Sequence, residues 1–98
     1  MSIPRKWVPY DSKWLVELAA QQHPDKQWLQ NALKRCTQCR RESKAYLHFV
    51  DPQKPNEVGS EWQFKTNLEL ESPSDGWIIL DILKGGRVGG VEFVDRLE

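Results

Sequence analysis

Hydrophobic and polar residues alternate most regularly over residues 61–71. Every second position is apolar or β-branched, and the positions between are polar or charged; the apolar series is Trp62, Phe64, Thr66, Leu68 and Leu70. A period of two is typical of a strand with one buried face and one face in solvent. The pattern predicts a long, half-exposed strand over residues 61–71.

The most apolar stretch is residues 76–83, and a second β-branched stretch follows at 88–94. Gly85 and Gly86 lie between them and permit the positive φ angles of a tight turn, so the pair predicts a hairpin. The nearly continuous apolar run predicts that both faces of the first strand are buried, with the N-terminal half as cover. One extra residue at Gly89-Gly90, a β-bulge, would bring Val88, Val91 and Phe93 to one face.

The N-terminal half predicts an extended arm and two helices. Residues 1–10 contain two prolines and several apolar residues, and we expect this arm to lie on the domain. A first helix is expected from Asp11 or Ser12 to about His23, because Pro24 disfavours helical geometry before it. A second helix is expected from Pro24 to Glu42 or Ser43, followed by a strand at 44–50 and a loop at 51–60.

These elements predict the α+β class, with two N-terminal helices packed on a four-stranded antiparallel meander sheet. The 98 residues are expected to form a single domain, 1–98. The net charge is zero, but residues 1–50 carry nine Lys/Arg and four Asp/Glu, whereas residues 51–98 carry five and ten. An acidic half suits a basic partner and argues against a general nucleic-acid binder. Simple solvation of a sheet is the alternative explanation.

The candidate chemistry is sparse. Cys36 and Cys39 have CxxC spacing, but the predicted helix would place the pair near its C-terminal end, where the dipole does not activate a thiol, with Cys36 in the core and Cys39 partly exposed. A zinc site needs four ligands, and no second CxxC is present. His48 is expected to be a satisfied strand residue, although Glu61 or Asp81 nearby would make it a possible general base. Asp81 is expected to be capped or paired with Arg87. We therefore predict a protein that is not an enzyme, with no catalytic residue, metal or cofactor.

Two segments, residues 59–67 and 76–93, resemble a family of short bacterial proteins similar to immunity proteins of contact-dependent growth inhibition toxins. The resemblance covers mainly residues 45–97. It implies a bacterial, cytoplasmic antitoxin that binds and neutralises the C-terminal nuclease domain of a cognate toxin, commonly an RNase that cleaves tRNA. No contact residues follow from the family, because its members bind through different surfaces.

The polar face of the 61–71 strand is the predicted toxin-binding surface. Its members are Glu61, Lys65, Glu69 and Glu71, with Asp75 beyond. Carboxylates there would match the basic active site of a nuclease. The alternative is a small nucleic-acid-binding module that uses the sheet face and the basic second helix. Neither membrane insertion nor direct nucleic-acid binding is expected for the inhibitor.

Overall fold

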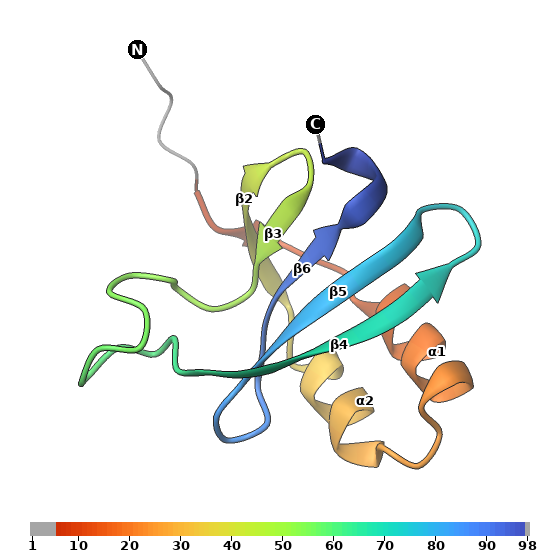
Figure 1. The fold of residues 1–98 in the computed structure, drawn as a ribbon, viewed down its shortest axis with the longest axis horizontal. Coiled ribbons are helices and arrows are strands. Elements are labelled where there is room, and N and C mark those ends of the chain that lie inside the picture. Colours follow the sequence, from red (N-terminus) through yellow and green to blue (C-terminus); the bar gives the residue numbers. More distant parts are fainter. Residues whose placement is uncertain (1–5, 98) are drawn as a thin grey trace.

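The computed structural model describes residues 6–97, which form helices on one side of a six-stranded sheet (Figure 1). In chain order the elements are β1 (Val8–Pro9), α1 (Lys13–Gln22), α2 (Gln27–Lys34), β2 (Gln38–Ser43), β3 (Tyr46–His48), β4 (Phe64–Ser72), β5 (Gly76–Leu83), β6 (Val88–Phe93) and the 3₁₀ turn η1 (Val94–Arg96). The predicted α+β class is confirmed.

The sheet is antiparallel and has the strand order β1-β2-β3-β6-β5-β4. The predicted four-stranded meander is wrong in strand number and in order. The last strand, β6, lies between β5 and β3, so that β4 is an edge strand. One additional strand, β1, comes from the N-terminal arm, whose first five residues lie outside the described part of the chain; the other, β2, comes from residues predicted as helix.

The first helix is confirmed, since α1 ends at Gln22 and His23 precedes Pro24. Its N-terminus is fixed by two contacts. The Asp11 carboxylate accepts a hydrogen bond from the Lys13 amide at 3.0 Å, and the buried Ser12 hydroxyl donates to the Leu33 carbonyl at 2.6 Å. The Ser12 bond joins the start of α1 to the end of α2.

The second helix is shorter than predicted. It ends at Lys34, and the expected continuation to Glu42 or Ser43 is wrong because residues 38–43 form β2. Cys39 pairs with Val8, and Arg40 pairs with His48. The apolar residues up to this stretch are also spaced as on a helix, so the local sequence does not distinguish a helix from a strand. Pairing with segments distant in the sequence determines that these residues form a strand. The cysteines are therefore not inside a helix: Cys36 follows α2, and Cys39 lies on β2.

The C-terminal hairpin is confirmed as β5 and β6. Gly85 and Gly86 have φ angles of +87° and +79° in its turn. Asp81 pairs with Gly90 and Ile82 with Val88, which leaves Gly89 as one extra residue on β6. This is the predicted bulge.

A second bulge lies at the start of β4. Phe64 pairs with Leu83 and Thr66 with Ile82, so Lys65 is an extra residue. Leu83 and Ile82 are consecutive and point to opposite faces, and Phe64 and Thr66 must do the same. The predicted alternation is therefore correct from Thr66 onward and is wrong at Phe64, which is 39% exposed. The strand starts at Phe64 rather than at Glu61.

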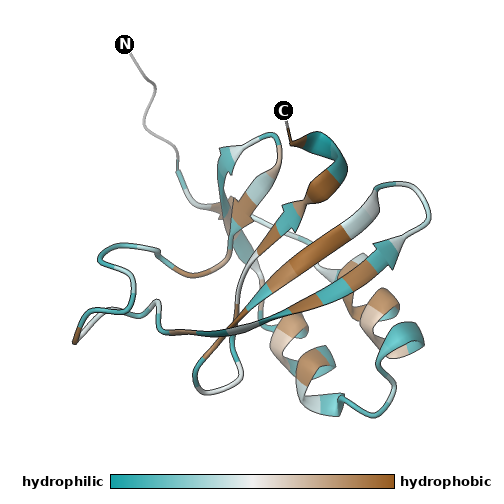
Figure 2. Ribbon diagram, viewed as in Figure 1, coloured by the Kyte–Doolittle hydropathy of each residue, from teal (hydrophilic) through white to brown (hydrophobic). Residues whose placement is uncertain are grey.

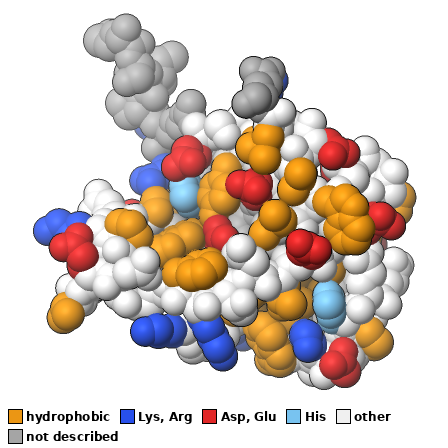
Figure 3. All heavy atoms as spheres, in the orientation of Figure 1, with side chains coloured by type: hydrophobic (Ala, Val, Ile, Leu, Met, Phe, Trp, Pro, Cys, Tyr) orange, Lys and Arg blue, Asp and Glu red, His pale blue; other side chains and the backbone are white. Residues whose placement is uncertain are grey.

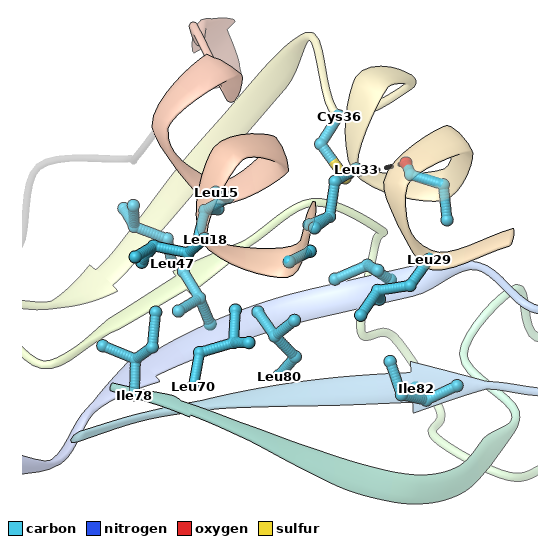
Figure 4. Close-up of a cluster of buried hydrophobic side chains, with 14 of the residues drawn as sticks. Leu15, Leu18, Leu29, Leu33, Cys36, Leu47, Leu70, Ile78, Leu80 and Ile82 are labelled. Carbon is cyan, nitrogen blue, oxygen red and sulfur yellow. Dashed lines mark hydrogen bonds between the residues drawn. The ribbon is translucent and has the colours of Figure 1, made fainter. Parts of the chain in front are cut away.

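The main hydrophobic core lies between the helices and one sheet face (Figure 4). Hydropathy along β4 alternates, and the apolar positions of α1 and α2 face the sheet (Figure 2). The core residues of the sheet that lie under the helices include Leu47, Leu70, Ile78, Leu80, Ile82 and Val91. The prediction that both faces of β5 are buried is wrong, because both helices pack on the same side. The opposite face of β5 has Trp77 at 50% exposure.

Candidate interaction face of the sheet

Neither helix covers the sheet face that lies opposite the main core on β4, β5 and β6, and we call the part of this face that the residues below form the open face. Residues directly opposite each other in paired strands project to the same side. Glu69 and Glu71 of β4 pair with Ile79 and Trp77 of β5, respectively. Ile79 also pairs with Glu92 of β6. Together with Asn67 and Asp81, which are paired in the same register, the open face consists of Asn67, Glu69, Glu71, Trp77, Ile79, Asp81 and Glu92.

Its centre is apolar. Trp77 is 50% exposed, and Ile79, two positions along β5, is half-buried. A half-exposed tryptophan beside an isoleucine on a rigid central strand is the kind of anchor that dominates protein interfaces. Backbone pairing with the neighbouring strands fixes the positions from which both side chains project.

Four carboxylates surround this apolar centre. Glu69 and Glu71 project from β4, Asp81 from β5 and Glu92 from β6. Figure 3 shows acidic side chains interspersed with hydrophobic ones over these strands, with Lys and Arg side chains toward the margins. Among residues 6–97, none of the four carboxylates has an ion-pair partner. The open face is therefore both apolar and negatively charged.

Asp81 is the most perturbed of these acids. Burial and, to a smaller extent, the nearby Glu92 carboxylate together raise its pKa to about 6. The expectation that Asp81 is capped or paired with Arg87 is wrong, because Arg87 contacts Glu61 instead. The Glu92 carboxylate on the adjacent strand disfavours ionisation of Asp81, which destabilises the isolated domain at neutral pH.

An aromatic cluster closes the opposite end of the same face. The imidazole of His48 lies 4.7 Å from the ring of Tyr46 and 5.6 Å from that of Trp62. A side chain at either bulge glycine would collide with this cluster: a Cβ on Gly89 would lie 2.8 Å from Trp62, and one on Gly90 would lie 2.8 Å from the Tyr46 hydroxyl. The two glycines thus permit aromatic packing as well as the bulge.

His48 is a buried structural residue. It is 6% exposed, and its Nε2 lies 3.0 Å from the Glu42 carboxylate. Neither Glu61 nor Asp81 is its partner, contrary to the possibility considered from the sequence. Its Nδ1 has no hydrogen-bond partner among the described residues. Aromatic rings flank the imidazole, so this geometry does not present a general base to solvent.

The structure brings together two of the five predicted binding residues. Glu69 and Glu71 lie on the open face, whereas Lys65 lies at the β4 bulge. Glu61 precedes the strand and its carboxylate is 3.6 Å from the Arg87 guanidinium. Asp75 lies in the β4–β5 turn and accepts a hydrogen bond from Arg96 at 2.9 Å, which is a structural role. The prediction that all five form one stripe is wrong.

The binding surface predicted from the sequence did not include Trp77, Asp81 and Glu92. The alternate positions of β5 carried a signal, because Trp77, Ile79 and Asp81 are spaced by two. Reading that signal required knowing that no helix covers this side.

The free edge of β4 is partly protected by the end of α1. The Gln22 side-chain amide donates to the Glu71 carbonyl at 2.7 Å and accepts from the Glu71 amide at 2.8 Å, as a neighbouring strand would. His23 Nε2 lies 3.2 Å from the Glu69 carbonyl. Covering an edge in this way limits unspecific strand pairing, and it fixes the strand that carries Glu69 and Glu71.

The cysteines are buried free thiols. Burial raises the pKa of Cys36 to about 12, against the lowering influence of Arg35 and Arg87, and burial also raises the pKa of Cys39. Both thiols are therefore protonated at neutral pH, which opposes nucleophilic chemistry.

No helix within residues 6–97 has the length and apolar character needed to cross a membrane. Comparisons with protein-family models, curated proteins and solved structures found no match to this chain. The resemblance to immunity proteins stays a prediction.

Proposed function

We propose that this protein is a non-catalytic binding domain whose open face docks on a basic surface of a partner protein. The observation that carries the proposal is the pair Trp77 and Ile79, which no helix covers, among four carboxylates that have no ion-pair partner within residues 6–97. The apolar pair supplies the area that binding removes from water, and the carboxylates direct the approach of a positively charged partner.

The specific function that we propose is that of an immunity protein, which neutralises a bacterial toxin nuclease in the cytoplasm. A nuclease must hold phosphates and therefore has a basic active-site region. Carboxylates at fixed positions on a sheet can occupy such a region in place of RNA. The resemblance of residues 45–97 to immunity proteins supports the same proposal.

The size of the domain is compatible with a stable complex. A standard interface takes about 800 Å² from each partner, which is roughly an eighth of the 6382 Å² that this protein exposes.

A nucleic-acid-binding function is less well supported. The carboxylates of the open face would repel phosphates, and aromatic stacking on this face would place bases beside Glu71 and Asp81. The basic residues that were expected along one long helix are divided between α2 and β2. They therefore do not form the single basic helix that nucleic-acid binding was predicted to use.

Co-expression with the product of the neighbouring gene, which the proposal expects to be the toxin domain, tests the immunity function. We expect the two proteins to co-purify and the toxin to be inactive. Glu71→Lys should weaken the complex by at least about tenfold, whereas Glu17→Lys, an equal charge change on an exposed position of α1, should leave affinity within about twofold. Absence of binding at micromolar concentration would refute the immunity function. Equal losses in both variants would show that only net charge matters.

A further inference from the structure

A groove with two arginines lies at the C-terminal end of α2, apart from the open face. It consists of two adjoining hollows of about 350 Å³ and about 180 Å³, and we call it the arginine groove. Both hollows are lined by Arg35, Phe49, Val50 and Arg87. The larger one is comparable in volume to small-molecule sites.

The two cations of the groove come from distant parts of the chain. Arg35 caps the C-terminus of α2, and Arg87 precedes β6. Both guanidinium groups act on the Cys36 thiol, which lines the smaller hollow, and both lower its pKa. Both arginines also line both hollows, so their positive charges lie around the same space.

The larger hollow is also lined by two carboxylates, Asp51 and Glu61, so an anion would have to be held by the arginines directly. Arg35 has no ion-pair partner among residues 6–97. Arg87 has a 3.6 Å contact with Glu61, whose side chain is 63% exposed, and such a long surface pair contributes little to stability. A bound anion with good geometry would compete successfully with Glu61 for Arg87.

The walls of the groove are aromatic and preformed. Phe49 lines both hollows, and its ring packs against Tyr10 at 5.2 Å. The Phe49 amide donates to the Gly89 carbonyl at 2.7 Å, which fixes the backbone. Trp7 also lines the larger hollow, and the Arg40 guanidinium lies over its ring, 5.3 Å from the ring centre. Aromatic rings beside two guanidinium groups suit a flat ligand with an acidic group.

We propose that the arginine groove binds a small organic anion with a flat ring. The acidic group, a phosphate or a carboxylate, is held between Arg35 and Arg87, and the ring lies against Phe49 and Trp7. Guanidinium groups form paired hydrogen bonds with either acid. None of the open-face residues lines the groove, so this site does not depend on the proposed protein-binding function.

Titration of the ¹⁵N-labelled protein with two probes, adenosine 5′-monophosphate and benzoate, tests the site. We expect saturable shifts of the Phe49, Val50 and Arg87 amides with at least one probe, with Kd below about 10 mM. Binding of only one probe identifies the acid as phosphate or carboxylate. Adenosine and inorganic phosphate should each bind at least about tenfold more weakly than the nucleotide, since each lacks half of the recognised structure.

Charge reversal separates a site from general electrostatics. Arg35→Glu should weaken binding by at least about tenfold, and Arg35→Gln should weaken it in the same direction. Lys34→Glu makes the same charge change one residue away, outside the groove, and should change Kd by less than about twofold. Absence of saturable shifts with both probes would overturn the proposal. Equal losses in Arg35→Glu and Lys34→Glu, or inorganic phosphate binding as tightly as the nucleotide, would also overturn it.

Discussion

Replacing Asp81 by asparagine should stabilise the protein at neutral pH and change how its stability depends on pH. Burial and the Glu92 carboxylate raise the pKa of Asp81 from 3.8 to about 6. The folded state thus holds the Asp81 proton more tightly than the unfolded state does. The contribution of Asp81 to the free energy of unfolding is therefore most favourable below about pH 4, and it decreases as the pH rises toward about 6.

The size of the effect follows from this shift. A difference of about two pKa units corresponds to roughly 3 kcal/mol at full strength. Because Asp81 is only partly buried and solvent screens its charge, we expect about 1–2 kcal/mol above pH 6. Asparagine has a similar shape but carries no ionisable group, so Asp81→Asn should remove the loss of stability that ionisation of Asp81 causes. The gain should be near zero at about pH 4 and complete at about pH 7.

Urea unfolding followed by tryptophan fluorescence at several pH values between about 4 and 7 measures the effect. The free energies of unfolding of Asp81→Asn and the wild-type protein should diverge as pH rises. Asp25→Asn, at an exposed turn position between the helices, should follow the wild-type profile. Parallel profiles for Asp81→Asn and wild type would refute the account of the open face as electrostatically strained.

Three further predictions concern the fold. Leu80→Ala removes a fully buried side chain beneath the helices and should cost about 2–5 kcal/mol in urea unfolding; a loss below about 1 kcal/mol would contradict the position of the core. Gly90→Ala places a methyl group 2.6 Å from the Leu47 carbonyl and should cost about 1–3 kcal/mol by the same assay, whereas unchanged stability would show that this contact is absent. Cys36 should resist iodoacetamide at neutral pH in the folded protein and react after unfolding, because burial raises its thiol pKa to about 12; equal rates, measured by mass spectrometry, would exclude a buried thiol.

The hairpin was predictable because its signals are local. Gly85 and Gly86 lie between two β-branched runs, and the phase of Val88 against Val91 required one extra residue. The long β4 strand was predictable for the same reason from Thr66 onward. Such patterns are complete within about ten residues and do not depend on distant partners.

The end of α2 and the strand order were not predictable in this way. Residues 38–43 are strand because Val8 and Leu47 pair with them from either side, and these contacts join distant segments. The open face depends on the same long-range topology. Both helices pack on one side of the sheet, so Trp77 is exposed although it belongs to the most apolar run of the chain.

The acidic surface predicted from the charge distribution consists partly of other residues than those predicted. The excess of acids in residues 51–98 correctly indicated a charged surface, and Glu69 and Glu71 belong to it. Asp75 and Glu61 are instead engaged by Arg96 and Arg87. The sequence does not show which carboxylates have arginine partners, because those partners are 21 or more residues away along the chain.

The affinity of two tryptophan variants for the toxin domain tests the central proposal, docking through the open face, most directly. Trp77 on β5 and Trp28 on α2 are exposed by 50% and 43%, respectively, so truncation to alanine removes similar accessible surface from different sides of the domain. With isothermal titration calorimetry we predict that Trp77→Ala raises Kd by at least about thirtyfold, a loss of about 2 kcal/mol, and that Trp28→Ala changes it by less than about threefold. The opposite order, or an unchanged Kd for Trp77→Ala, would contradict docking through the open face.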